Sequence, residues 1–169
     1  MNFIVSVDDN WAIGRGGQLL ARIPEDMRFF RYTTGGGAVV MGDVTWASLP
    51  EQARPLPERL NIVLSDRPEF AAEGAVTVHS FEELRALLRE IAERQEIFVI
   101  GGAAVYRLLM DYCQYAYITR LYHAFDADKH IPSLDDDARW RLLLQTPRRE
   151  HNGLEYSYCL YHNSAALSL

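Results

Sequence analysis

The chain has 169 residues, which suits one ordinary domain, and its 49% hydrophobic and 24% charged composition is typical of a soluble globular protein. A formal net charge of −6 argues against a nucleic-acid surface, which normally carries a basic patch. No apolar run approaches the roughly 20 residues of a membrane span, and no basic region precedes the short apolar run at the N-terminus. We therefore expect a cytoplasmic protein that binds neither nucleic acid nor membrane.

The first half of the chain is predicted to alternate strands with helices. Pro24, followed by Glu25 and Asp26, favours a helix start, because proline suits the first turn and acids suit the positive end of the helix dipole. Three glycines and no regular period at 11–20 indicate a mobile surface loop, either a plain glycine loop or a lid. The other predicted elements are strands at 3–7, 38–41, 60–65 and 75–78, a helix from 24 to about 34, and a short helix at 45–49.

The second half begins with a helix and ends in strands. Ser80 and Glu83 form a capping box that opens a helix to about Arg94, with a core stripe of Phe81, Leu84, Leu88 and Ile91. A strand at 96–100, a Gly101-Gly102 turn, a helix at 103–111 and strands at 115–122, 140–145 and 154–161 follow. This order predicts one α/β domain over residues 1–169, with a mainly parallel sheet, antiparallel C-terminal strands and a frayed tail at 164–169.

Asp26 is the first residue of chemical interest. On a helix that begins at Pro24, Ile23 and Phe30 lie within about 60° of Asp26, so this carboxylate shares the apolar face. It must find hydrogen-bond donors, have its pKa raised, or line a cavity in which a ligand supplies donors. Bonds from the first-turn N–H groups of its own helix explain the residue equally well.

Gly101-Gly102 is the second candidate site. Paired glycines between a strand and a helix bring the backbone close to a ligand, and free N–H groups at the helix start attract phosphate. The three spaced glycines of the dinucleotide fingerprint are absent, and a simple tight turn is the commoner explanation. Neither a nucleophile motif nor metal-ligand spacing is present, and Cys113 and Cys159 read as small buried residues, so we predict no metal. These features suit a cofactor that brings the chemistry.

Six segments in series resemble dihydrofolate reductase. They are Ile13-Gly14; Ile23 to Met27 with Phe30; Val40 to Gly42 with Thr45, Trp46 and Ser48; Pro55 to Asn61; Ile100 to Gly102 with Tyr106; and Thr119 with Asp128 and Pro132. The resemblance implies reduction of 7,8-dihydrofolate to tetrahydrofolate by hydride transfer from NADPH, which supplies one-carbon and thymidylate metabolism. It also implies about eight strands and four helices, a monomer, and binding of antifolates such as methotrexate or trimethoprim.

The resemblance further implies residue roles. Asp26 would bind the pterin with support from Thr119, Arg59 would hold the glutamyl α-carboxylate, and Gly101-Gly102, joined by a cis bond, would meet the pyrophosphate. The implied substrate-binding residues are Ile4, Val5, Met27, Phe30, Leu49, Arg59 and Ile100. The implied cofactor-binding residues are Ser6, Ile13, Gly14, Leu19, Gly42, Asp43, Thr45, Ser65, Asp66, Arg67, His79, Gly101, Gly102, Ala103, Ala104, Val105 and Tyr106.

Two positions depart from the family pattern. Ala21 stands where many members have tryptophan, so a roomier pocket is expected. Asp43 and Val44 follow Gly42, where the family usually carries arginine and a second basic residue that help to bind the 2′-phosphate of the cofactor. A carboxylate repels a phosphate dianion but can accept a hydrogen bond from a ribose hydroxyl. Arg67 or His79 can compensate, so we predict NADPH with relaxed discrimination against NADH.

Two other functions remain open at this point. The first is a reductase of the same fold that acts on an aminopyrimidine ribosyl phosphate of riboflavin synthesis, although Asp26 and Arg59 suit a pterin that carries glutamate. The second is a non-catalytic pteridine-binding protein that has lost cofactor affinity, a possibility suggested by Asp43. An assay for reduction of dihydrofolate distinguishes dihydrofolate reductase from the first alternative. A change in melting temperature with NADPH distinguishes it from the second.

Overall fold

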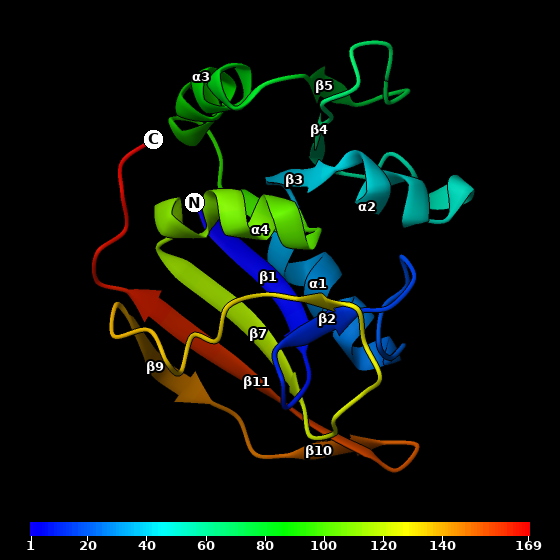
Figure 1. Cartoon of the computed structure of the whole chain (residues 1–169), viewed down its shortest axis with the longest axis vertical. Helices are drawn as coiled ribbons and strands as arrows, with labels where there is room; N and C mark the ends of the chain where they lie inside the picture. Colours follow the sequence, from blue (N-terminus) through cyan, green and yellow to red (C-terminus); the bar gives the residue numbers. More distant parts are fainter.

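The most apolar segments of the chain form the middle of one large sheet in the computed structural model, which describes residues 1–169 (Figure 1). In spatial order its strands are β10 (Arg149–His151), β11 (Leu154–Asn163), β7 (Tyr115–Leu121), β1 (Asn2–Val7), β6 (Ile97–Gly101), β3 (Ala38–Gly42), β4 (Leu60–Leu64) and β5 (Val76–Val78), and β9 (Trp140–Gln145) also pairs with β11. Nearly continuous runs of strand formers suit strands covered on both faces.

The sheet is parallel in one part and antiparallel in the other. All pairings from β7 through β1, β6, β3 and β4 to β5 are parallel. The pairs of β11 with β7, β9 and β10 are antiparallel. The predicted α/β architecture, a mainly parallel sheet with antiparallel C-terminal strands, is therefore confirmed.

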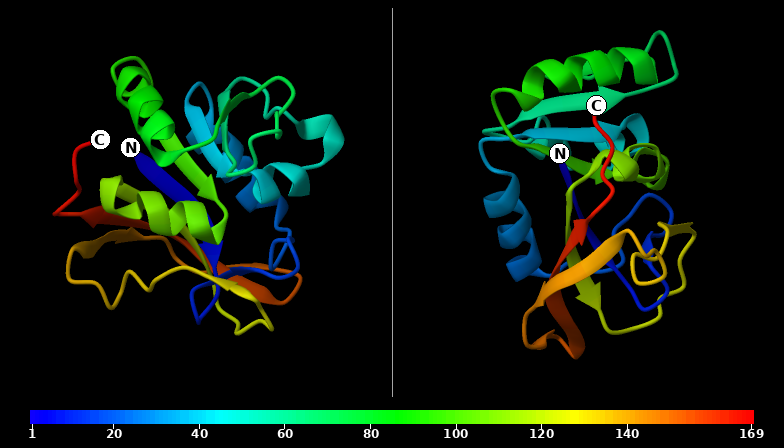
Figure 2. Two further views of the ribbon diagram at one scale, coloured as in Figure 1. Left: turned by 45° about the horizontal axis from the view of Figure 1, so that its top comes forward. Right: turned by 90° about the vertical axis from the view of Figure 1, so that its left-hand side faces the viewer.

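Helices cover both faces of the sheet. Successive strand residues point in opposite directions, so each central strand packs against the helices on both sides. Val40 packs in the core with α3 (Phe81–Ala92) and α4 (Ala103–Leu109), whereas its neighbours Val39 and Met41 pack on the side of α1 (Pro24–Thr34) and α2 (Asp43–Ser48). The right-hand view of Figure 2 shows α1 and α4 on opposite sides. Two single 3-10 turns, η1 (Glu51–Ala53) and η2 (Met110–Tyr112), complete the helical segments. None of the helices has the length and apolar character that a membrane span requires.

The capping of α3 follows the sequence prediction in one half only. The Ser80 hydroxyl accepts a hydrogen bond from the Glu83 amide at 3.1 Å, as expected for a capping serine. The Glu83 carboxylate, however, accepts from the amide of His79 and not from that of Ser80. The stripe residues Leu84, Leu88 and Ile91 are buried, which confirms that this face is core.

Two segments are more ordered than predicted. Residues 11–20 contain a short strand, β2 (Ala12–Gly14), which pairs with β8 (Lys129–His130), so the prediction of a wholly irregular loop is wrong. Three residues are too few to show a period of two, and their partner lies more than a hundred residues away. The tail is not frayed, because its Leu167 amide donates to the Asp111 carbonyl at 2.8 Å and Leu169 packs against the core.

Candidate active site

A buried carboxylate lies where α1 meets the sheet. Asp26 is only 7% exposed, although it sits in the first turn of a surface helix. Thr119 Oγ1 donates to Asp26 Oδ1 at 2.5 Å, and Ser6 Oγ donates to Asp26 Oδ2 at 2.8 Å. Ser6 and Thr119 are register partners on neighbouring strands β1 and β7, so both side chains point to the face on which α1 packs.

The environment of Asp26 makes its ionisation less favourable than it is in water. Burial raises the pKa of Asp26 above its ordinary value, and the hydrogen bonds from Thr119 and Ser6 only partly oppose this effect. The donors to the Asp26 carboxylate are the Ser6 and Thr119 hydroxyls on β1 and β7 and not backbone amides of α1, so the explanation by first-turn amides is wrong. A carboxylate offers about four lone-pair positions, and the two hydroxyls occupy one on each oxygen. The other positions can accept two hydrogen bonds from a ligand.

Two neighbours of Asp26 were not recognised as such in the sequence. The family resemblance implies a cofactor contact for Ser6, and the structure adds a hydrogen bond from the Ser6 hydroxyl to Asp26. Tyr158, opposite Thr119 in the register of β11 and β7, was not singled out at all. Burial, with a smaller effect from the Asp26 charge, raises the pKa of Tyr158 to about 12. Side chains alternate between the two faces along β11, so Tyr156 and Tyr158 must share one face of the sheet. This alternation is the sequence signal from which Tyr158 could be found.

Arg59 is held rigidly beside the C-terminal end of α1. Its Nε donates to Thr34 Oγ1 at 2.7 Å, its Nη1 to the Pro57 carbonyl at 2.6 Å and its Nη2 to the Arg31 carbonyl at 2.9 Å. A guanidinium has five N–H donors, so one on each terminal nitrogen is left for a carboxylate. Burial and, secondarily, the nearby charge of Arg31 lower the pKa of Arg59. The geometry fits a planar carboxylate at the surface.

Asn61 shapes the loop that carries Arg59. This side chain is 2% exposed, accepts from the Leu56 amide at 2.9 Å and donates to the carbonyls of Leu56 and Arg59 at 2.9 and 3.0 Å. We expect Asn61→Ala to lower the free energy of unfolding by about 2 to 3 kcal/mol, because it removes three hydrogen bonds and leaves partly buried backbone groups of Leu56 and Arg59 without these partners. Urea unfolding measures the change. A loss below about 0.5 kcal/mol would show that the loop holds its shape without Asn61.

A second group of predicted residues meets at the carboxyl ends of β3 and β6. These strands are parallel neighbours, and α2 and α4 begin directly after them. The Gly101–Gly102 peptide bond is cis, as the family resemblance implies. A Cβ atom on Gly102 would lie 3.1 Å from Thr45 Oγ1, so the diglycine and Thr45 are close and only glycine leaves this cradle open. No side chain caps α4.

Asp43 lies in the region expected to bind the adenosine phosphate. Its Oδ2 accepts from Ser65 Oγ at 2.7 Å and from Arg67 Nε at 3.0 Å, and Arg67 Nη2 is 2.9 Å away. Burial acts to raise the pKa of Asp43, but the bonds from Ser65 and Arg67 outweigh it and hold the pKa below its ordinary value. Asp43 is therefore ionised at neutral pH and engages both predicted phosphate ligands.

The remaining predicted residues occupy varied surroundings. The Ile4 carbonyl accepts from Tyr106 Oη at 2.8 Å, and Val5 packs on the opposite face of the sheet from Asp26. His79 Nδ1 is 3.1 Å from the Ser65 carbonyl. Of the others, the exposed residues are Leu19, Met27, Asp66 and Ala104; the half-buried are Ile13, Phe30, Gly42, Leu49, Ile100 and Ala103; the buried are Gly14 and Val105.

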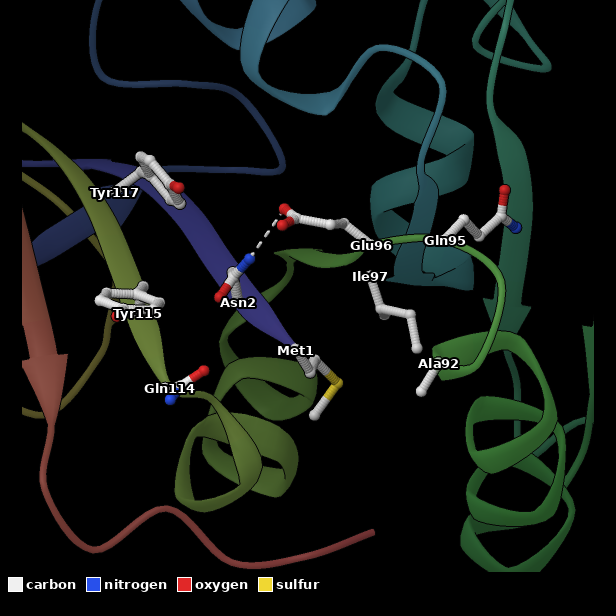
Figure 3. A pocket seen from close by; sticks show the side chains of 9 residues that line it. All are labelled: Met1, Asn2, Ala92, Gln95, Glu96, Ile97, Gln114, Tyr115 and Tyr117. Carbon is white, nitrogen blue, oxygen red and sulfur yellow. Dashed lines mark hydrogen bonds between the residues drawn. The ribbon is translucent and has the colours of Figure 1, made fainter.

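A hollow of about 380 Å³ lies elsewhere on the molecule (Figure 3). Its lining includes Asn2, Ile97 and Tyr115, which begin β1, β6 and β7, and Asn2 Nδ2 donates to Glu96 Oε2 at 3.2 Å. Ligands of open α/β sheets bind outside the carboxyl ends of the strands, whereas this hollow is at the amino ends. Its lining contains no basic residue for a phosphate. The candidate active site is therefore the region of Asp26.

A buried acid on one side of the sheet and an open diglycine turn at its carboxyl edge fit the class of cofactor-dependent oxidoreductases. The family model described as Dihydrofolate reductase matches residues 1–163. The chain is 34% identical to dihydrofolate reductase of Bacillus subtilis over 95% of this chain and 93% of that protein. It is 39% identical to the Mycobacterium tuberculosis enzyme over 90% and 91%. The chain belongs to the dihydrofolate reductase family.

A solved structure agrees with this assignment. Dihydrofolate reductase from Enterococcus faecalis, complexed with NADP(H) and RAB-propyl, superimposes with a TM-score of 0.82 at 30% identity. The match covers 96% of this chain and 95% of the other. The relatives favour neither the riboflavin-pathway reductase nor a non-catalytic binding protein.

Proposed function

We propose that the chain reduces 7,8-dihydrofolate to tetrahydrofolate and that Asp26 anchors the pterin ring. The observation that carries this role is the burial of Asp26 with one hydroxyl donor on each oxygen, because this leaves acceptor positions for two ring N–H groups. When bound, NADPH supplies the hydride for C6. The proposal also includes a cytoplasmic monomer and binding of methotrexate or trimethoprim at the same carboxylate.

The residues of the chain position the reactants and control charge. An ionised Asp26 favours a protonated pterin electrostatically, while a water molecule delivers the proton to N5. Ser6 and Thr119 fix the carboxylate so that its free lone pairs face the ligand. Donor and acceptor carbons must be held about 3 to 3.5 Å apart with water excluded, a task that falls to the loop at 11–20 and to Phe30 and Leu49.

The cofactor fits the open diglycine cradle. Because Gly102 has no side chain facing Thr45, the backbone of Gly101, Gly102 and Ala103 can meet the pyrophosphate and the Thr45 hydroxyl a phosphate oxygen. Ser65 and Arg67 are the ligands for the 2′-phosphate, but Asp43 binds both of them. We therefore propose that NADPH is used with relaxed discrimination against NADH, since Asp43 can accept a hydrogen bond from a ribose hydroxyl.

Arg59 is proposed to bind the glutamyl α-carboxylate of the substrate. Methotrexate carries a glutamyl tail. We expect Arg59→Lys to weaken the binding of methotrexate by about 10- to 100-fold, because lysine cannot make a bidentate bond to the tail carboxylate. Trimethoprim lacks the tail, so its Kd should change less than about twofold. Titration of both compounds against the variant measures the difference, and equal losses for the two would contradict the role.

Spectrophotometric reduction of dihydrofolate tests the proposed function. Steady turnover with NADPH, blocked by trimethoprim, is the expected result. The non-catalytic alternative predicts that antifolates raise Tm while NADPH and NADH leave it unchanged. If the protein reduces an aminopyrimidine ribosyl phosphate but does not reduce dihydrofolate, the proposed function is wrong and the riboflavin-pathway activity takes its place.

A further inference from the structure

Asp8 is a second buried carboxylate, and no role has yet been given to it. It directly follows β1, two residues after Ser6, and its exposed fraction is 0%. Asp8 Oδ1 accepts from the amides of Asn10 at 2.8 Å and Ala12 at 2.9 Å, and Oδ2 accepts from the Phe125 amide at 2.9 Å. A buried acid with three backbone donors and no basic partner joins separate pieces of chain.

The first piece is the turn at the base of the 11–20 loop. The Asp8 amide donates to the Ala12 carbonyl and the Trp11 amide to the Asp8 carbonyl, both at 3.1 Å. Trp11 adopts a φ of 58°, a left-handed conformation that a bulky residue rarely takes without support. The bonds from Asn10 and Ala12 to Asp8 Oδ1 provide this support and aim the chain into β2.

The second piece is the segment that carries Phe125. This segment runs beside the 11–20 loop, where β8 pairs with β2 and the Ile131 amide donates to the Trp11 carbonyl at 3.0 Å. Near the tip of the loop, the contacts are long or exposed. The Gly16 amide reaches the two carboxylate oxygens of Asp128 at 3.3 Å, and the Arg15 and Asp126 side chains of one ion pair are 63% and 79% exposed. Exposed pairs of this kind contribute little.

We propose that Asp8 is a positioning residue for hydride transfer: it locks the base of the 11–20 loop to the segment at 125, so that the loop closes over the nicotinamide as a preset unit. The inference rests on the proposed function, because only a reductase requires the loop to exclude water at the transfer. Asp8 touches neither substrate nor cofactor. It acts through Ile13 and Gly14, which lie one and two residues beyond its Ala12 contact.

Asp8→Asn separates the two attachments. One amide oxygen can still accept from Asn10 and Ala12, but the NH2 group then faces the Phe125 N–H, donor against donor. We expect the single-turnover rate of hydride transfer to fall on the order of tenfold, because small misplacements at a transfer site are costly. The Kd of methotrexate without cofactor should stay within about twofold. Asp9→Asn is the matched control, since the exposed Asp9 side chain has no hydrogen bond, and should match the unmodified chain in both measurements.

An unchanged hydride-transfer rate in folded Asp8→Asn protein, with only Tm lowered, would overturn the proposal and leave Asp8 a purely structural acid. Hydrogen exchange of the unmodified protein provides a second test that does not depend on the variant. The amides of Asn10, Ala12 and Phe125 should exchange slowly and at similar rates with or without NADPH, whereas the Gly16 amide should be fast and gain protection when NADPH binds. Exchange at Phe125 as fast as at Gly16 would contradict the lock.

The two proposals fail in different ways. A protein without any reduction of dihydrofolate would refute the proposed function, and the exchange rates at Asn10, Ala12 and Phe125 would still report whether the lock exists. Full wild-type turnover combined with rapid exchange at Phe125 would refute the lock alone.

Discussion

Asp26→Asn is expected to lower kcat/KM for dihydrofolate at pH 7 by about 30- to 150-fold. The variant replaces two charge-assisted hydrogen bonds to the pterin, each contributing about 1.5 to 3 kcal/mol, by weaker neutral ones. Since about 1.4 kcal/mol corresponds to a factor of ten in rate, the loss follows from these bonds alone. Initial rates over a range of dihydrofolate concentrations measure it.

Glu25→Gln is the matched control for this substitution. Glu25 is the neighbouring acid in the same helical turn, but its half-buried carboxylate pairs with Arg28 and lies 3.8 Å from His151 Nδ1, and it makes no bond to Ser6 or Thr119. Its kcat/KM should remain within about threefold of the unmodified enzyme. An Asp26→Asn protein with full activity at neutral pH would remove Asp26 from the mechanism.

The Asp26→Asn variant should be more stable than the unmodified chain at neutral pH. Burial raises the folded-state pKa of Asp26 above its ordinary value of 3.8, so the folded state holds the proton more tightly than the unfolded state. Stability from this group is complete below pH 3.8 and is lost as pH rises through the raised pKa. The Tm advantage of Asp26→Asn should therefore be smallest in acid and reach a plateau of a few degrees at neutral pH. A constant difference across this range would contradict the raised pKa.

Asp43→Asn should increase the preference for NADPH over NADH by about 10- to 100-fold. An amide no longer repels the 2′-phosphate, and it releases Arg67 and Ser65 to bind that group. A charge-assisted bond of about 1.5 to 3 kcal/mol sets the size of the change. The ratio of kcat/KM for the two cofactors measures it in both proteins.

Glu69→Gln controls for the loss of one negative charge in the same region. The exposed Glu69 carboxylate forms no ion pair with Arg67 and is not among the residues expected to bind the cofactor, so the cofactor ratio should change less than about threefold. A thousandfold preference for NADPH in the unmodified protein would refute relaxed discrimination. An unchanged ratio in Asp43→Asn would show that the Asp43–Arg67 pair does not set the preference.

Local sequence signals were enough for most of the fold. The helix start at Pro24, the serine cap at Ser80 and the apolar strands carry their information within a few residues, so their positions could be predicted. The β2–β8 pair could not, because each strand is very short and gains its stability from a distant partner. The attachment of Leu167 and Leu169 likewise depends on tertiary packing.

The site also divides into features that the local sequence pattern predicts and contacts that depend on tertiary structure. The inward direction of Asp26 could be read from the helical period, and the Thr119 bond to Asp26 agrees with the support that the family resemblance implies. The bond from Ser6 requires the register of β1 against α1, and the grip of Asp43 on Arg67 joins residues 24 positions apart. Such contacts depend on the three-dimensional arrangement of strands and not on local pattern.

The register match of Ser6 with Thr119 also restricts what can bind beside them. Each hydroxyl has one proton, and both protons point at Asp26. Neither group can therefore offer a proton to an incoming heterocycle, and an ionised Asp26 can only accept. A ring edge that presents N–H groups can bind here, whereas an isostere with carbonyl oxygens on that edge is repelled. Ser6 and Thr119 therefore make the site selective for one tautomer of the ligand.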